Sequence, residues 1–77
     1  MAAMNSTQAL SLLGKTLDLV VCIPTEEGPD YDRFLGTIMA VQVPAPGTGV
    51  EWSVLIHQDG YPADYMEFIE LERLHFG

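Results

Sequence analysis

Four aromatic or titratable side chains in the second half of the chain have the types that could line a binding pocket: Trp52, His57, Tyr61 and Tyr65. His57 ends a run of strand-like alternation, and the two tyrosines flank a proline turn. No serine or cysteine motif accompanies His57 or His75, so a general base would have no nucleophile to activate. We expect both histidines to form strand-end hydrogen bonds. The tyrosines either line a pocket or cover the end of a small barrel, and the alternation places Trp52 in the core.

The most acidic stretch is TEEGPDYDR, which contains a Gly-Pro pair typical of a loop. Asp30 and Asp32 form a D-x-D pair within it. A calcium loop needs a longer ligand series, a glycine for the turn and a distal glutamate, so no metal site is expected here. A solvated acidic loop is the simpler interpretation. As a partner-facing surface, our first choice is Glu26, Glu27, Asp30, Tyr31 and Asp32.

Other chemistries lack their residues. Cys22 lies in the apolar run LDLVVCIP, where a buried structural thiol is expected and no neighbouring base would activate it. One cysteine and two scattered histidines match no zinc-ligand spacing. Gly47-Thr48-Gly49 is followed by neither a helix nor a lysine, so it predicts no phosphate-binding loop. We expect no metal and no cofactor. Whether the chain is an enzyme stays open, with a non-enzymatic protein favoured.

The charge balance limits the possible partners. Eleven acidic residues face three basic ones, for a net charge of −8. Such a surface repels phosphate backbones and anionic membranes, so direct binding of nucleic acid or membrane is not expected. The acidity either keeps an apolar domain soluble or recognises a basic protein. The apolar runs are too short to span a membrane, and the start lacks the features of a signal peptide, so a cytoplasmic location is expected.

A helix is expected first. NSTQALSLLGK predicts one or two turns, capped by Asn5, Ser6 or Thr7 and ended by Gly14 in a left-handed conformation. The apolar face of this helix would consist of Ala9, Leu10, Leu12 and Leu13.

Strand-like runs follow the helix. TLDLVVCIP is apolar on both faces and is expected to end at Pro24. In FLGTIMAVQV, Gly36 is interpreted as a bend or bulge. VEWSVLIH, from Val50 to His57, shows the clearest alternation, and it should form a hairpin with the preceding strand across the tight connection APGTG.

The tail from Pro62 to Leu74 fits either a helix or a strand. We favour a single turn at 63–65 and then a strand in which Ile69 and Leu71 share a face. Together these elements predict a mainly β chain, α+β at the margin: a small antiparallel SH3-like half-open barrel of four to five strands with a short N-terminal helix.

The chain length predicts one domain, 1–77, of which residues 1–4 are expected to be disordered. A domain of this size is only marginally stable alone. One cysteine excludes an intrachain disulfide, and 48% of the residues are hydrophobic. Homo-oligomerisation is therefore the expected source of additional stability.

The segment Leu71-Glu72-Arg73-Leu74 resembles the tail of the plasmid-borne type II dihydrofolate reductases, which end in a Leu-Glu-Arg-aliphatic pattern. The resemblance covers about the last thirty residues and implies an SH3-like barrel, oligomerisation and an origin on a mobile gene cassette. The pore motif Val-Gln-Ile-Tyr of that family is replaced here by Ala63-Asp64-Tyr65-Met66. An acidic chain would also repel the family's anionic ligands, so reductase activity is not expected.

The leading hypothesis is a non-enzymatic β-barrel module that forms a homo-oligomer and binds a basic protein through the acidic stretch. The alternative is a small-molecule binder, or a weak enzyme, with a pocket at a subunit interface.

Overall fold

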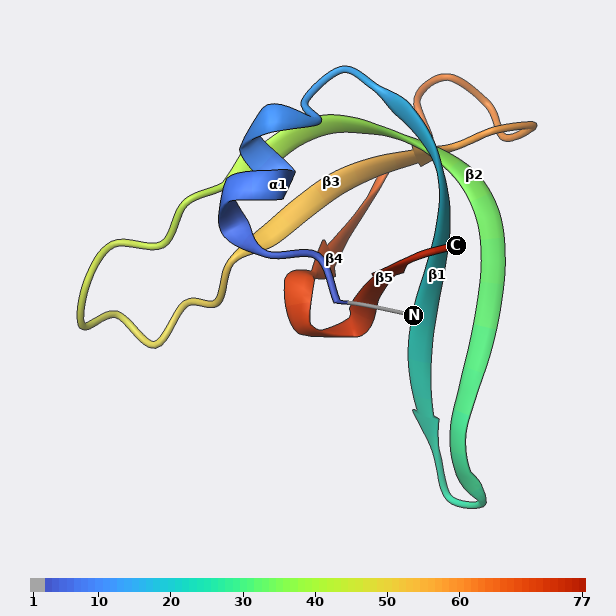
Figure 1. Ribbon diagram of the computed structural model, residues 1–77, viewed down its shortest axis with the longest axis horizontal. Coiled ribbons are helices and arrows are strands. Elements are labelled where there is room, and N and C mark those ends of the chain that lie inside the picture. The colour runs from blue at the N-terminus through green and yellow to red at the C-terminus, as the bar shows by residue number, and fades with distance from the viewer. Residues whose placement is uncertain (1–2) are drawn as a thin grey trace.

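Within residues 3–77, alternating apolar residues form five antiparallel strands that curl into a half-barrel, preceded by one short helix (Figure 1). The computed structural model describes residues 3–77. The sheet order is β4-β3-β2-β1-β5. The elements are α1 (Ser6–Ser11), β1 (Thr16–Thr25), β2 (Gly28–Gln42), β3 (Ser53–Gln58), β4 (Glu67–Glu70), the 3₁₀ turn η1 (Leu71–Arg73) and β5 (Leu74–Phe76). The predicted fold class, a mainly β half-open barrel with an N-terminal helix, is confirmed.

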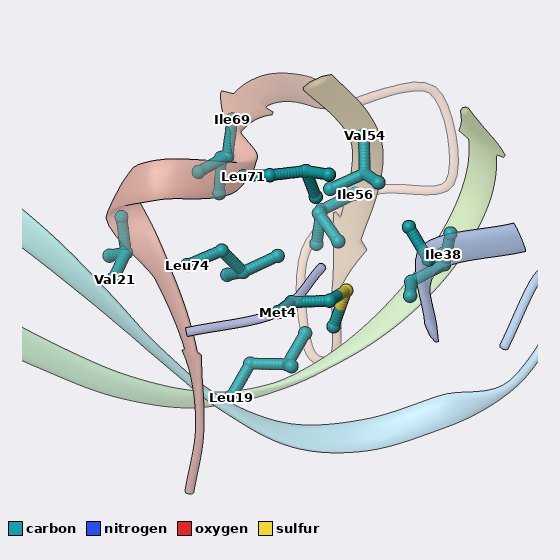
Figure 2. Packing of buried hydrophobic residues seen from close by; sticks show 10 residues of the cluster. Met4, Leu19, Val21, Ile38, Val54, Ile56, Ile69, Leu71 and Leu74 are labelled. Atoms are coloured by element: carbon teal, nitrogen blue, oxygen red, sulfur yellow. The ribbon is translucent and has the colours of Figure 1, made fainter. Parts of the chain in front are cut away.

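One face of every strand supplies the core. Leu19, Ile38, Val54 and Leu74 are fully buried, and they point into one shared interior (Figure 2). The register explains this, because Ile38 pairs with Ile56 and Val54 pairs with Ile69, and cross-strand partners point to the same face of a sheet. The remaining buried cluster members are Met4, Ala9, Val21, Ile56, Ile69 and Leu71.

The N-terminal segment is anchored from residue 3 onward, which corrects the expected disorder of residues 3 and 4. Ala3 forms a β-bridge with His75, and the amide of Met4 donates to the carbonyl of Leu74 at 3.0 Å. The Met4 side chain is 3% exposed and lies among the core residues (Figure 2). Burial of this thioether offsets the entropy lost on ordering the segment. Residues 1–2 lie outside the described residues.

Helix α1 begins where the capping residues predict. Asn5 is the N-cap: its side chain accepts from the amide of Gln8, and the Gln8 side chain accepts from the amide of Asn5, which completes a capping box. Gly14 follows the helix with a φ of 82°, as predicted. The expected apolar face is only half correct. Ala9 is buried and Leu12 packs on the core, whereas two leucines are exposed, Leu10 and Leu13.

Strand β2 is closely packed at Gly36 and irregular three residues later. Gly36 is buried, and a Cβ atom there would lie 2.8 Å from the ring of Phe34 and 2.9 Å from Ile56. Glycine thus lets the Phe34 ring close over the strand. The bulge itself lies at Met39, because the pairing shifts between Ile38 and Ala40. The prediction located the irregularity at Gly36, three residues too early.

Two connections differ from the sequence-based expectation. Strand β3 starts at Ser53 rather than Val50, and residues 43–52 form a long loop that extends away from the barrel (Figure 1). Prolines and positive-φ glycines, among them Gly47 and Gly49, keep this segment out of the ladder. The predicted turn at 63–65 is present, with the amide of Tyr65 bonded to the carbonyl of Pro62. A strand follows, and the 3₁₀ turn η1 then redirects the chain into β5.

Candidate functional site

The acidic stretch is a β-hairpin and not a loop, which corrects the sequence-based expectation. Strands β1 and β2 remain paired down to Thr25 and Gly28, so that only Glu26 and Glu27 form the turn. The two strands project beyond the rest of the barrel as a two-stranded ribbon (Figure 1). Pro24 does not end β1, because it pairs with Pro29. Neither proline has an N–H to donate, and this pair is tolerated where the ladder needs no donor.

Strand alternation divides the predicted partner-facing residues between two faces. Asp30 pairs with Ile23 and Asp32 pairs with Val21, so both aspartates share the inner, concave face of the ribbon. Tyr31 pairs with Cys22 on the opposite, outer face. Glu26 and Glu27 are exposed at the tip, with Gly28 next to them at a φ of 118°.

Tyr31 belongs to a separate outer hollow, which it lines together with Val20, Arg33 and Phe76. Arg33 forms an ion pair with Asp18 in this region, and its Nε donates to Asp18 Oδ1 at 3.0 Å. This hydrogen bond lowers the pKa of Asp18 below its usual value. Arg33 therefore pairs with Asp18 on the outer face and not with the aspartates of the inner face.

A cleft of about 140 Å³ opens on the inner face at the root of the ribbon. Its apolar wall combines residues from four strands: Val21, Ile23, Phe34, Ile56, Phe68 and Ile69. Val21, Ile56 and Ile69 line the cleft and also belong to the core cluster (Figure 2). The cleft is thus the open mouth of the half-barrel, where the hydrophobic core reaches solvent.

Polar side chains surround this apolar wall. Asp32 comes from β2, Glu67 from β4, Arg73 from η1 and Gln58 from the end of β3, and Tyr65 adds an aromatic ring. The register explains how Glu67 reaches the site, because it pairs with Ile56 and hence points inward. Two carboxylates and one guanidinium leave the cleft with a net negative charge.

Arg73 has a structural partner of its own. Its Nε donates to the carbonyl oxygen of Cys22 at 3.0 Å. Strands β1 and β5 pair only over Leu19–Val21, and Cys22 follows at the free edge of β1. The Arg73 side chain replaces the missing backbone donor there. Within residues 3–77 the only ion pair joins Asp18 and Arg33, so the Asp32 and Glu67 carboxylates have no ion-pair partner in that range.

Of the four predicted pocket residues, Tyr65 lines the cleft, whereas Trp52, His57 and Tyr61 are not part of its lining. His57 Nε2 lies 3.2 Å from the carbonyl oxygen of Tyr61 and 3.1 Å from that of Pro62, as expected of a strand-end histidine. The rings of Tyr61 and Tyr65 lie 5.2 Å apart, but only Tyr65 reaches the cleft. Trp52 packs against the core, as predicted.

Sequence reasoning missed Glu67, Arg73 and Phe34 as members of a site. The alternation in FIELERL, which begins directly after Glu67, predicts which residues share a face of the strand. It does not indicate which of the two faces lines the mouth of the barrel. Cys22 is partly buried and free. In the described part of the chain no group of three or more His, Cys, Asp or Glu side chains could hold a metal ion.

Comparison with known proteins finds no matching family model, no matching curated protein and no matching solved structure. Within residues 3–77 no helix has the length and apolar character needed to cross a membrane.

Proposed function

We propose that this protein is a small, non-enzymatic binding module that recognises a basic protein segment along the inner face of the β1–β2 ribbon. The observation that carries the proposal is an alignment of carboxylates that have no ion-pair partner within residues 3–77. They run from the exposed tip to the cleft: Glu26 and Glu27, then Asp30, then Asp32 and Glu67. The ribbon projects from the barrel, so a partner can approach it without displacing the core.

Charge favours a polypeptide partner with positive charge. The net charge of −8 attracts cations over long range and repels nucleic acids and anionic small molecules. Folate-like or dinucleotide ligands would meet Asp32 and Glu67 at the cleft, which disfavours a reductase. No nucleophile lies beside a base in the cleft, which favours binding over catalysis.

Self-association is the second part of the proposal. On the outer face Ala40 pairs with Leu55, and Leu55 pairs with Phe68, which gives an apolar row across three strands. Phe68 is 55% exposed. A second copy of the chain is the partner that we propose for this row, at whose end Phe68 also borders the cleft.

The proposed binding is tested with a fluorescein-labelled decalysine peptide. We expect saturable binding to the wild type that weakens as salt is raised, because exposed charges are screened. Glu26→Gln, Glu27→Gln, Asp30→Asn and Asp32→Asn combined should reduce the affinity at least tenfold while the circular dichroism spectrum stays unchanged. These side chains are exposed and their amides keep the same shape.

A matched control carries four neutralised carboxylates away from the ribbon: Glu51→Gln, Asp59→Asn, Glu70→Gln and Glu72→Gln. It has the same net charge as the ribbon variant. Similar affinities for the two variants would show that only total charge matters, and they would contradict recognition by the ribbon. No binding of decalysine to the wild type at low salt would contradict the proposed function altogether.

A further inference from the structure

We propose that the cleft at the root of the ribbon receives one lysine side chain of the basic segment. This inference rests on the proposed function, because it names the point on the same surface at which the partner is held. It concerns Asp32 and Glu67, whereas the exposed tip at Glu26 and Glu27 would act only through long-range attraction.

The shape and the apolar wall suit the stem of a lysine. A volume of about 140 Å³ accommodates one side chain rather than a folded element or a large ligand. Ile23, Phe34 and Ile69 offer apolar surface to a four-carbon chain. Lysine places its methylene groups along such surface while its ammonium group stays near water.

The rim suits the ammonium group. Asp32 and Glu67 line the cleft from different strands and have no ion-pair partner in the described chain, so a cation there gains two carboxylate contacts. Arg73 is the cation that lines the same cleft, and its Nε is bonded to the Cys22 carbonyl. The two carboxylates and the guanidinium together carry one net negative charge, and one added positive charge neutralises it. Tyr65 contributes an aromatic ring, which also favours a cation.

An anionic or neutral occupant fits these groups less well. A carboxylate or phosphate would gain Arg73 but would lie beside two carboxylates. A neutral aliphatic side chain would use the apolar wall and leave the rim unmatched. The arrangement therefore selects a long aliphatic stem that ends in a positive charge.

The test uses amide chemical shifts of the ¹⁵N-labelled protein. Titration with Nα-acetyl-lysine methylamide should shift the amides of Asp32, Phe34, Glu67 and Ile69 saturably. The norleucine analogue, which has the same aliphatic stem without the ammonium group, should shift them much less. With decalysine, the amides of the cleft and of the ribbon tip should both move.

A matched pair of variants on β4 distinguishes the cleft from general acidity. Glu67 lines the cleft, whereas Glu70 lies three residues further along the same strand and lines a different hollow. Glu67→Gln should weaken decalysine binding about threefold at low salt, as expected for one partly exposed ion pair. Glu70→Gln should leave the affinity within the measurement error. Spectra of the free variants show whether each one folds.

The outcomes separate this inference from the function on which it rests. If decalysine binds but moves only the amides of the ribbon tip, or if the two glutamate variants behave alike, the cleft is not the lysine site and the ribbon proposal stands. If decalysine does not bind at all, both proposals fail. Equal shifts from the lysine and norleucine compounds would identify an apolar pocket without selectivity for cations.

Discussion

Glu72 shows how a single residue in this acidic chain responds to its neighbours. A side-chain hydrogen bond with Glu70 raises the pKa of Glu72 above its usual value, and the negative charges of Glu70 and Glu51 raise it further. The positive charge of Arg73 lowers the pKa of Glu72, but this effect is smaller than the combined effect of the carboxylates. The folded protein therefore binds the Glu72 proton more tightly than the unfolded chain does.

Because proton binding and folding are linked, the direction of the pKa shift sets how the stability changes with pH. Because the folded-state pKa of Glu72 is raised, its contribution to stability is fully present below the unfolded value and is lost as the pH rises through the folded pKa. Asp18 acts with the opposite sign. Arg33 lowers its pKa, so its contribution is present above the unfolded value and is lost as the pH falls through the folded pKa.

A difference measurement isolates Glu72. Glu70→Gln removes the neighbouring charge, so the free energy of unfolding of this variant, relative to wild type, should increase as the pH rises from about 4 to about 6. Urea unfolding at several pH values measures it. Glu27→Gln, at the ribbon tip, makes the same charge change without touching Glu72. If both variants show the same pH profile, the contact between Glu70 and Glu72 has no thermodynamic effect.

Residue types alone identified only part of the candidate site. The acidic residues and Tyr31 were selected together because they are adjacent in the chain, and the ladder separates Tyr31 from Asp30 and Asp32. Glu67 and Arg73 become neighbours of Asp32 only after β4, η1 and β2 have been placed in one barrel. Such a grouping depends on strand pairing between distant parts of the chain, which cannot be predicted from the spacing of residues within one segment.

At the scale of the elements, local chemistry was most informative where a specific residue sets a boundary. Asn5 caps the helix and Gly14 is left-handed, as predicted, although the helix already ends at Ser11 with Leu12 as its C-cap. Prolines were misleading in one place, because the pairing of Pro24 with Pro29 lets the ribbon continue where a break was expected. Backbone pairing on both sides of Pro24 and Pro29 stabilises the ribbon. The local sequence around Pro24 does not reveal this pairing.

The cap of α1 makes a testable contribution to the fold. Asn5→Ala should lower the stability by about 1 kcal/mol, because both hydrogen bonds of the capping box would lose their geometry. For a domain of this size the melting temperature should fall by roughly 4–8 °C. Asn5 also follows the buried Met4, so the loss would loosen the N-terminal contact with β5.

Thr7→Ala is the matched control for the cap. Thr7 is exposed in the same first turn and forms no side-chain hydrogen bond with the described residues. Alanine favours a helix more than threonine does, so this variant should be unchanged or slightly more stable. Equal melting temperatures for wild type and Asn5→Ala would show that α1 does not depend on its cap.

At the scale of the whole molecule, the distribution of apolar surface separates two faces. The inner face closes around the core and ends in the cleft. In the outer row, Ala40 and Leu55 are partly buried, whereas Phe68 is exposed. The free edge of β4 carries Glu67 and Glu70, and edge charges oppose strand-to-strand association. Face-to-face contact through the outer row is therefore the form of self-association that we expect.

Native mass measured at several concentrations, by light scattering and native mass spectrometry, tests this expectation. The wild type should exceed the 8.5 kDa of one chain, and Phe68→Ser should shift the equilibrium toward the monomer. Burying one phenylalanine contributes about 2 kcal/mol, and a two-fold interface contains the residue twice, so the dissociation constant should rise at least a hundredfold.

Leu10→Ser is the control for this variant, because Leu10 is 50% exposed on α1 and lies outside the outer row. It removes a comparable apolar side chain from a different surface, so it should leave the native mass unchanged. If Leu10→Ser dissociates the assembly and Phe68→Ser does not, the helix rather than the sheet forms the contact between copies. A wild type that stays monomeric at every concentration would contradict self-association, and the exposed Phe68 would then require a partner other than a second copy of this chain.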